Sequence, residues 1–129
     1  MLAVWKEWNL YEILQNAYEK GIVMSGVSAG AICWFDKGIT DSYAEELAII
    51  DCLGIVDGIA CPHFDEEKDR EPYVNDVINR EIIKSCICIE GNCALHIKNN
   101  IDYSSIDFGN GRKCYRVFKE NNTLKKEII

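Results

Sequence analysis

The fold is decided by residues 22–35, which have the sequence IVMSGVSAGAICWF. The first three, Ile22 to Met24, form a short continuous apolar run, which is typical of a strand buried on both faces of a parallel sheet. Small residues follow as far as Gly30, and apolar residues that suit a helix continue to Phe35. The stretch therefore predicts a strand, a tight turn and a helix, the unit from which α/β folds are built.

A helix is predicted immediately before this stretch, from Asn9 to about Lys20. Asn9 suits a helix N-cap with Glu12 as its capping-box partner, and Gly21 suits the C-terminal cap. Between them, apolar residues recur at helical spacing at Leu10, Ile13, Leu14 and Ala17.

The remainder of the chain alternates in the same way. A strand is predicted over residues 58–63, where Pro62 closes it, and a helix from Pro72 to about Lys84. Further strands are predicted at residues 86–89, 93–97, 115–118 and 123–129, separated by asparagine- and glycine-rich turns. We found no internal repeat and no low-complexity linker, so we expect a single mixed α/β domain over residues 1–129.

Composition excludes several classes of function. The chain has 129 residues, 48% of them hydrophobic, and a net charge of -7, the wrong sign for binding nucleic acid through its phosphates. No apolar run approaches the ~20 residues that span a bilayer, and the first nine residues do not resemble a signal peptide. We therefore expect a cytoplasmic protein that binds neither nucleic acid nor a membrane.

Seven cysteines raise the question of disulfides or a metal site. An odd number without a secretion signal argues against a disulfide framework. Cys86 and Cys88 are separated by one residue, which is not the spacing of a structural zinc site. We expect buried, reduced thiols and no bound metal.

The chemistry is concentrated in a G-x-S-x-G pattern formed by Gly26, Ser28 and Gly30. Such a nucleophile elbow needs small residues two before and two after the serine, because the sharp turn leaves no room for a Cβ atom there. It holds the serine hydroxyl at the carboxyl edge of the sheet, and we expect a positive φ or strain at Ser28. The backbone amide of Ala29 would then donate to an oxyanion at the start of a helix.

A nucleophilic serine requires a base, and the chain has two histidines. His96 lies within a predicted strand between Leu95 and Ile97 and is interpreted as an ordinary strand residue. His63 follows Pro62 at the end of a predicted strand, where the functional residues of open α/β sheets gather. We therefore predict that His63 lies within hydrogen-bond reach of Ser28.

Three blocks together resemble the peptidase E (aspartyl dipeptidase) family of serine peptidases, peptidase family S51. They are residues 25–35 (SGVSAGAICWF), residues 38–42 (GITDS) and residues 61–65 (CPHFD), in the family's order and spacing. The resemblance implies a flavodoxin-like, mostly parallel sheet related to the class I glutamine amidotransferases, here with antiparallel strands at the C-terminus. It also implies a Ser-His-acid mechanism that cleaves short peptides, N-terminal aspartyl dipeptides among them, without a cofactor.

The resemblance assigns roles residue by residue. Ser28 matches the nucleophile and His63 the base. Asp41 and Glu90 both match candidates for the acid. We favour Asp41, because the chain order Ser, Asp, His is also that of the α/β hydrolases. Arg70 resembles the position that binds the acidic side chain of the substrate, as a guanidinium fork can do with two hydrogen bonds.

The chain departs from the family pattern at its N-terminus. The resemblance covers nearly all of this chain but only the latter part of the family pattern, without the first strands and a glycine-rich loop that gives the second oxyanion amide. The predicted strand at 22–24 would then be an open sheet edge, which favours a homo-oligomer. Two alternatives stay open: a truncated, catalytically silent α/β module, and a glutamine amidotransferase-like enzyme. The second is disfavoured because the elbow holds serine where that chemistry uses cysteine, and Cys33 is a helical turn further on.

Overall fold

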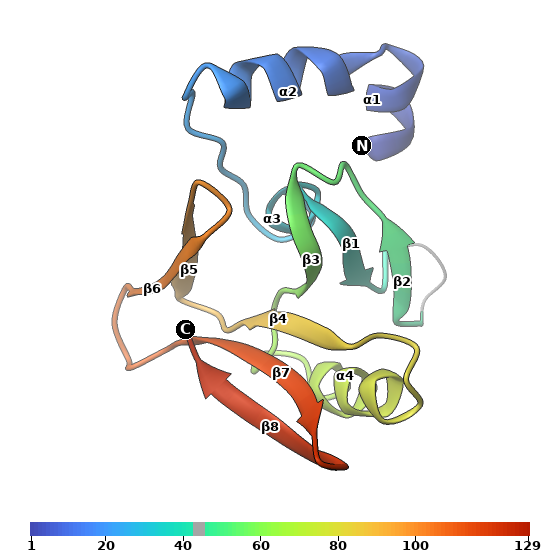
Figure 1. Cartoon of the computed structure of the whole chain (residues 1–129), viewed down its shortest axis with the longest axis vertical. Helices are drawn as coiled ribbons and strands as arrows, with labels where there is room; N and C mark the ends of the chain where they lie inside the picture. Colours follow the sequence, from blue (N-terminus) through green and yellow to red (C-terminus); the bar gives the residue numbers. More distant parts are fainter. Residues whose placement is uncertain (43–45) are drawn as a thin grey trace.

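The computed structural model describes residues 1–42 and 46–129 as a mixed α/β fold (Figure 1). Its main sheet has six strands in the order β2-β1-β3-β4-β7-β8. These strands are β1 (Phe35–Thr40), β2 (Ala48–Asp51), β3 (Val56–Cys61), β4 (Ser85–Ile89), β7 (Cys114–Glu120) and β8 (Thr123–Ile128). Strands β5 (Cys93–Lys98) and β6 (Asp102–Asp107) form a separate two-stranded sheet.

The centre of the main sheet is parallel and its flanks are antiparallel. Strand β3 pairs in parallel with β1 on one side and with β4 on the other, while β2, β7 and β8 pair antiparallel with their neighbours. The carboxyl ends of β3 and β4 consequently meet at one edge of the sheet, where functional side chains of open α/β sheets collect. The mixed α/β architecture and the antiparallel C-terminal strands are confirmed, whereas the flavodoxin-like assignment stays a prediction.

Two apolar layers cover the sheet. Helix α4 (Arg70–Asn79) packs Val74, Val77 and Ile78 against Cys61 and Val117 on one face. On the other face, the short helix α3 (Ala29–Ile32) and the β5–β6 hairpin enclose a smaller cluster of apolar residues, namely Ile32, Phe35, Val56, Ala60 and Ile87. The alternating residues Leu95 and Ile97 of β5 pack against this second cluster, as their pattern predicts.

The N-terminal helices lie apart from these layers. Helix α1 (Leu2–Glu7) and helix α2 (Leu10–Glu19) contain no buried residue, and in Figure 1 they lie beyond the end of the sheet. Trp5 makes a tilted ring contact with Trp34 at a centroid distance of 6.3 Å, and the Tyr18 hydroxyl donates to Asn100 at 3.1 Å. In the part of the chain that the structure describes, no helix has the length and apolarity to cross a membrane.

Three expectations about the elements need correction. The predicted strand at 22–24 is wrong, because this segment pairs with no strand among the described residues. The helix after the elbow ends at Ile32 rather than at Phe35, and the helix predicted to end near Lys84 ends at Asn79. Glu81, with φ of 59°, turns the chain out of that helix. Helix α1 and strands β1, β2 and β6 were not predicted.

The cysteines agree with their expected state. All seven are free, and five of them are buried. Burial raises the pKa of the Cys61 thiol and of the Cys114 thiol to about 12, so both are protonated near neutral pH. They behave as small apolar side chains of the core.

Candidate active site

The elbow positions Ser28 through one tight backbone contact. A Cβ atom added at Gly26 would lie 1.9 Å from the carbonyl oxygen of Gly30, whereas one added at Gly30 would meet no atom within 4 Å. The glycine requirement therefore holds at Gly26 and not at Gly30, which corrects the expectation that both positions need one. Ser28 has φ of 54° and ψ of -119°, the strained conformation predicted for an elbow serine.

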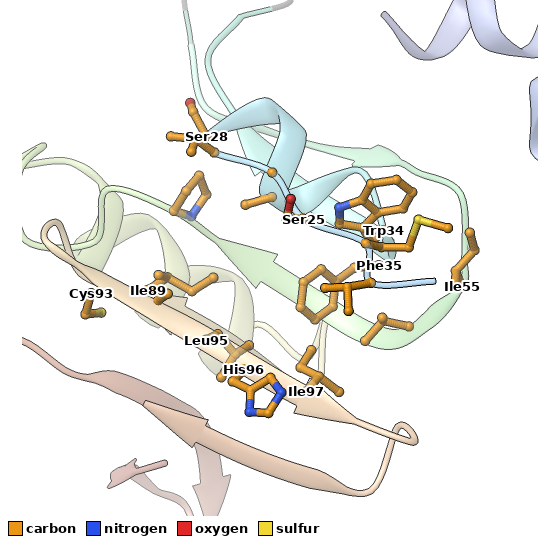
Figure 2. Close-up of a pocket in the computed structure, with 18 of the residues that line it drawn as sticks. Ser25, Ser28, Trp34, Phe35, Ile55, Ile89, Cys93, Leu95, His96 and Ile97 are labelled. Carbon is orange, nitrogen blue, oxygen red and sulfur yellow. The ribbon is translucent and has the colours of Figure 1, made fainter. Parts of the chain in front are cut away.

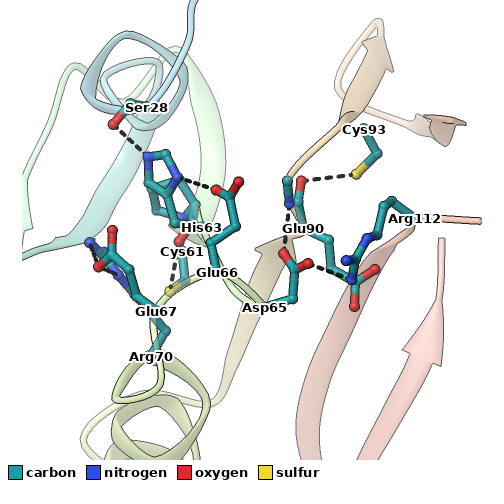
Figure 3. A network of polar contacts seen from close by, with 12 residues as sticks. Ser28, Cys61, His63, Asp65, Glu66, Glu67, Arg70, Glu90, Cys93 and Arg112 are labelled. Atoms are coloured by element: carbon teal, nitrogen blue, oxygen red, sulfur yellow. Dashed lines mark hydrogen bonds and ion pairs between the residues drawn. The ribbon is translucent and has the colours of Figure 1, made fainter. Parts of the chain in front are cut away.

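The structure brings Ser28 and His63 together. The Oγ atom of Ser28 is 2.8 Å from Nε2 of His63, which is within hydrogen-bond reach (Figure 3). His63 follows β3 with a φ of 54°, a left-handed conformation that is uncommon for a residue other than glycine. Strain of this kind costs about 1–3 kcal/mol and is concentrated at functional sites. His96 is exposed on β5, as expected of an ordinary strand residue.

Glu66 occupies the position opposite Ser28 on the imidazole ring. Its Oε2 atom is 2.6 Å from Nδ1 of His63, and its side chain is about half exposed. An ionised carboxylate only accepts hydrogen bonds, so this contact places the proton of a neutral imidazole on Nδ1. Nε2 is then left as an acceptor for the Ser28 hydroxyl, which is the arrangement that general-base chemistry requires.

Sequence reasoning did not identify Glu66. The signal was present, because Glu66 comes three residues after His63 at the start of an acidic run. An acidic run before a helix is equally typical of a solvated helix entrance, so the pattern alone does not single out Glu66. The left-handed conformation of His63 and the hydrogen bond from the Glu66 N–H to the His63 carbonyl at 3.1 Å bend the chain and bring the two side chains together.

Neither predicted acid contacts His63. An Oδ1 atom of Asp41 accepts from the guanidinium of Arg70 at 3.3 Å. Glu90 does lie at the carboxyl end of β4, beside the end of β3, but its Oε2 atom accepts from the backbone N–H of Lys113 at 3.0 Å. Among the described residues, the carboxylate that contacts the His63 ring is that of Glu66.

Arg70 is enclosed rather than open to a ligand. Its side chain is 3% exposed, and its nitrogens donate to the Glu67 carboxylate at 2.7 Å, to the Ile39 carbonyl at 3.0 Å and to Asp41. Burial by itself lowers the pKa of the guanidinium, but the hydrogen bond to Glu67 and the nearby acidic groups raise it above its ordinary value. Arg70 joins the start of α4 to the end of β1. It is not among the residues that line the cavity beside Ser28 and His63.

The amide next to the nucleophile has the position of an oxyanion donor. The Ala29 N–H makes no hydrogen bond to any of the described residues, while the following N–H groups of Gly30 and Ala31 bond to the carbonyls of Val27 and Ser28. An unbonded amide one residue after the serine is the donor that an elbow provides.

Comparison with known proteins identifies the family of this chain. The family model described as "Peptidase family S51" matches residues 1–101. The chain is also 42% identical over 124 residues to a Bacillus subtilis (strain 168) protein named "Uncharacterized peptidase YgaJ". That match covers 96% of this chain and 54% of the relative, so the chain spans about half the length of the curated relative. The match over most of its length shows that this chain belongs to peptidase family S51.

Proposed function

We propose that this chain hydrolyses peptide bonds, with Ser28 as nucleophile, His63 as general base and Glu66 orienting the imidazole. The observation that carries the proposal is the continuous contact from Ser28 Oγ through both ring nitrogens of His63 to the Glu66 carboxylate, at 2.8 and 2.6 Å. Membership of a peptidase family and the name of the relative from Bacillus support it.

The chemistry follows from these positions. Ser28 Oγ attacks the carbonyl carbon of the peptide while Nε2 of His63 takes the hydroxyl proton. The carbonyl oxygen becomes an oxyanion, for which the Ala29 N–H is the donor. His63 then gives the proton to the leaving amine, and the C–N bond breaks to leave an acyl ester on Ser28. A water molecule, deprotonated by His63, hydrolyses that ester and returns the serine hydroxyl.

A preference for N-terminal aspartate is not part of this proposal. It was expected from the resemblance to the family, with Arg70 at the position that binds the acidic side chain, but three acceptors within the protein already occupy that guanidinium. Asp41 is likewise assigned to holding Arg70, so Asp41→Asn is expected to reduce stability more than reactivity.

The direct test is the reactivity of Ser28 with a fluorophosphonate, which labels activated serines irrespective of peptide specificity. Labelling is expected on Ser28, with loss in Ser28→Ala and retention in Ser25→Ala, a matched change three residues earlier. Glu66→Gln should lower the labelling rate by on the order of 10²-fold, at the low end of general acid–base effects, and Glu90→Gln by less than about threefold. A folded wild-type chain whose Ser28 is no more reactive than Ser25 would refute hydrolysis and leave the catalytically silent module as the function of this chain.

A further inference from the structure

Asp65 joins three segments of the chain close to His63. It comes two residues after the histidine, and its Oδ1 atom accepts from the backbone N–H of Gly91 at 2.7 Å. Its Oδ2 atom is 2.5 Å from Nη1 of Arg112, a contact that Figure 3 shows. The Asp65 side chain is 15% exposed, so both contacts are largely shielded from water, and hydrogen bonds to an ionised carboxylate are among the stronger ones. The turn after β3, the loop after β4 and the loop before β7 are therefore fastened to one another.

Gly91 packs directly against the Glu66 carboxylate. A Cβ atom added at Gly91 would lie 2.5 Å from Cδ of Glu66, and Oε1 would be closer still. The φ of Gly91 lies outside the left-handed region, so its backbone conformation does not require glycine. The space that the Glu66 carboxylate takes is what requires a residue without a side chain at this position.

Glu66 needs such a support because little else holds it. Its side chain is 46% exposed, and among the described residues its one side-chain hydrogen bond is to Nδ1 of His63. An exposed pair of flexible side chains gains little from its charges and loses rotamer freedom when it is held in one geometry. Packing against a fixed backbone removes the alternative rotamers in advance. The bond from the Gly91 N–H to Asp65 fixes that backbone.

The loop that carries Arg112 is itself held in place. The Asp107 carboxylate accepts from three backbone N–H groups of this loop, that of Arg112 among them, at 2.9 to 3.3 Å. Neither Arg112 nor Asp65 is among the residues that line the cavity beside Ser28 (Figure 2). Any effect of these two residues on the site must therefore pass through the residues that they hold.

We propose that Asp65, Gly91 and Arg112 form a clasp that positions the imidazole of His63. The clasp acts by holding the Glu66 carboxylate at Nδ1 of the ring, so that the proton stays there and Nε2 is left to accept from the serine hydroxyl. The consequence for catalysis rests on the proposed hydrolysis, whereas the position of the ring proton does not. Asp65, Gly91 and Arg112 are thus positioning residues that act through Glu66.

The experiment has two readouts, both taken on the full chain. One is the rate of fluorophosphonate labelling of Ser28. The other is the nitrogen NMR spectrum of His63, which distinguishes a proton on Nδ1 from one on Nε2 and requires no reaction. The spectrum is taken at about pH 8.5, where an imidazole is ordinarily neutral. His96, which is exposed on β5, is the internal reference.

Gly91→Ala is expected to slow labelling by about tenfold, because the new methyl group takes the place of the Glu66 carboxylate. The melting temperature should stay close to that of the wild type, since the displaced atoms are the end of a flexible side chain that can turn into solvent. His63 should then lose its preference for a proton on Nδ1.

Arg112→Gln tests the clasp from its far end. Labelling is expected to slow by about threefold, because Asp65 keeps its bond to Gly91 and loses only the guanidinium. Arg112→Lys should bring the rate to within about twofold of the wild type, since an ammonium can make an ion pair with the same carboxylate. Arg80→Gln is the matched control, because it removes an exposed ion pair with Asp76 at the end of α4, and it should leave the rate unchanged.

A double-mutant cycle decides whether the clasp acts through Glu66. In a Glu66→Gln background, Gly91→Ala and Arg112→Gln should each change the labelling rate by less than about twofold. Two outcomes would overturn the proposal: losses in that background as large as in the wild type, or a His63 spectrum that neither variant changes. If the spectra change as expected but wild-type Ser28 does not react with the fluorophosphonate, the clasp stands and the proposed hydrolysis fails.

Discussion

Replacing Gly26 by alanine tests the geometry of the elbow directly. The added Cβ would lie 1.9 Å from the Gly30 carbonyl oxygen, and real Cβ atoms essentially never approach another atom more closely than 3.0 Å. Either Gly26 or the first turn of α3 must therefore move by at least 1.1 Å. That turn begins at Ala29, immediately after the nucleophile, so the movement displaces both Ser28 Oγ and the Ala29 N–H.

Gly26→Ala is expected to lower both the stability of the chain and the labelling rate of Ser28. Overpacking of a rigid contact costs about 1–3 kcal/mol of stability, which is several degrees in melting temperature for a domain of this size. A displacement of about 1 Å at a reacting group costs on the order of 10²-fold in rate, here in fluorophosphonate labelling of Ser28. Melting is measured by circular dichroism, and labelling is compared at a temperature where both proteins are folded.

Gly30→Ala is the matched control. It lies in the same motif, its Cβ would meet no atom within 4 Å, and alanine is favoured over glycine in a helix by about 1 kcal/mol. Wild-type labelling with equal or higher stability is therefore expected. Equal behaviour of Gly26→Ala and Gly30→Ala, in melting and in labelling, would refute the claim that the Gly26–Gly30 contact positions Ser28.

Two further predictions concern stability and association. Burial raises the pKa of Cys61 and of Cys114 from 9.0 to about 12, so the unfolded chain loses these protons first as the pH rises. The contribution of the two protonated thiols to the free energy of unfolding is then fully present below about pH 9. Between about pH 9 and 12 it falls by up to about 1.4 kcal/mol per pH unit for each thiol. Urea unfolding at about pH 8 and about pH 10.5 checks this, and an unchanged midpoint would contradict it. The second prediction is that the exposed apolar residues around the elbow segment favour a homo-oligomer, which sedimentation over a concentration series tests. A monomer at every concentration, without binding of a dye for apolar surfaces, would count against association.

The sequence predicted the elements that carry their own local signal. Strands β3, β4, β5 and β7 are short apolar or alternating runs between turn residues, and each lies where its pattern places it. Residues 22–24 have an equally apolar pattern, but a strand is defined by a hydrogen-bonded neighbour, which local composition cannot supply. Strand β6 has the opposite problem, because its sequence DYSSID is polar and it exists through pairing with β5.

Within the site, local patterns predicted the two residues whose positions depend on short-range geometry. Ser28 is fixed by the elbow, and His63 follows a strand end beside it. The contact between Glu66 and His63 depends on the left-handed backbone conformation of His63. That conformation has no signature in an unaligned sequence. The environment of Arg70 depends on contacts with β1, about thirty residues earlier in the chain, and so only the folded chain shows that its guanidinium is already occupied.

The sparse packing of α1 and α2 gives the molecule unequal local stability. Because neither helix contains a buried residue, both can unfold at little cost in free energy while the sheet and α4 remain intact. The bond after Lys20 joins the end of α2 to Gly21, so trypsin should cut there in the native protein long before it degrades the core. The product would retain the elbow and His63 but lose Tyr18 and Glu19 from the wall of the cavity beside Ser28 and His63. A single nick would thus leave the serine and its base in place while it removes part of the wall beside them.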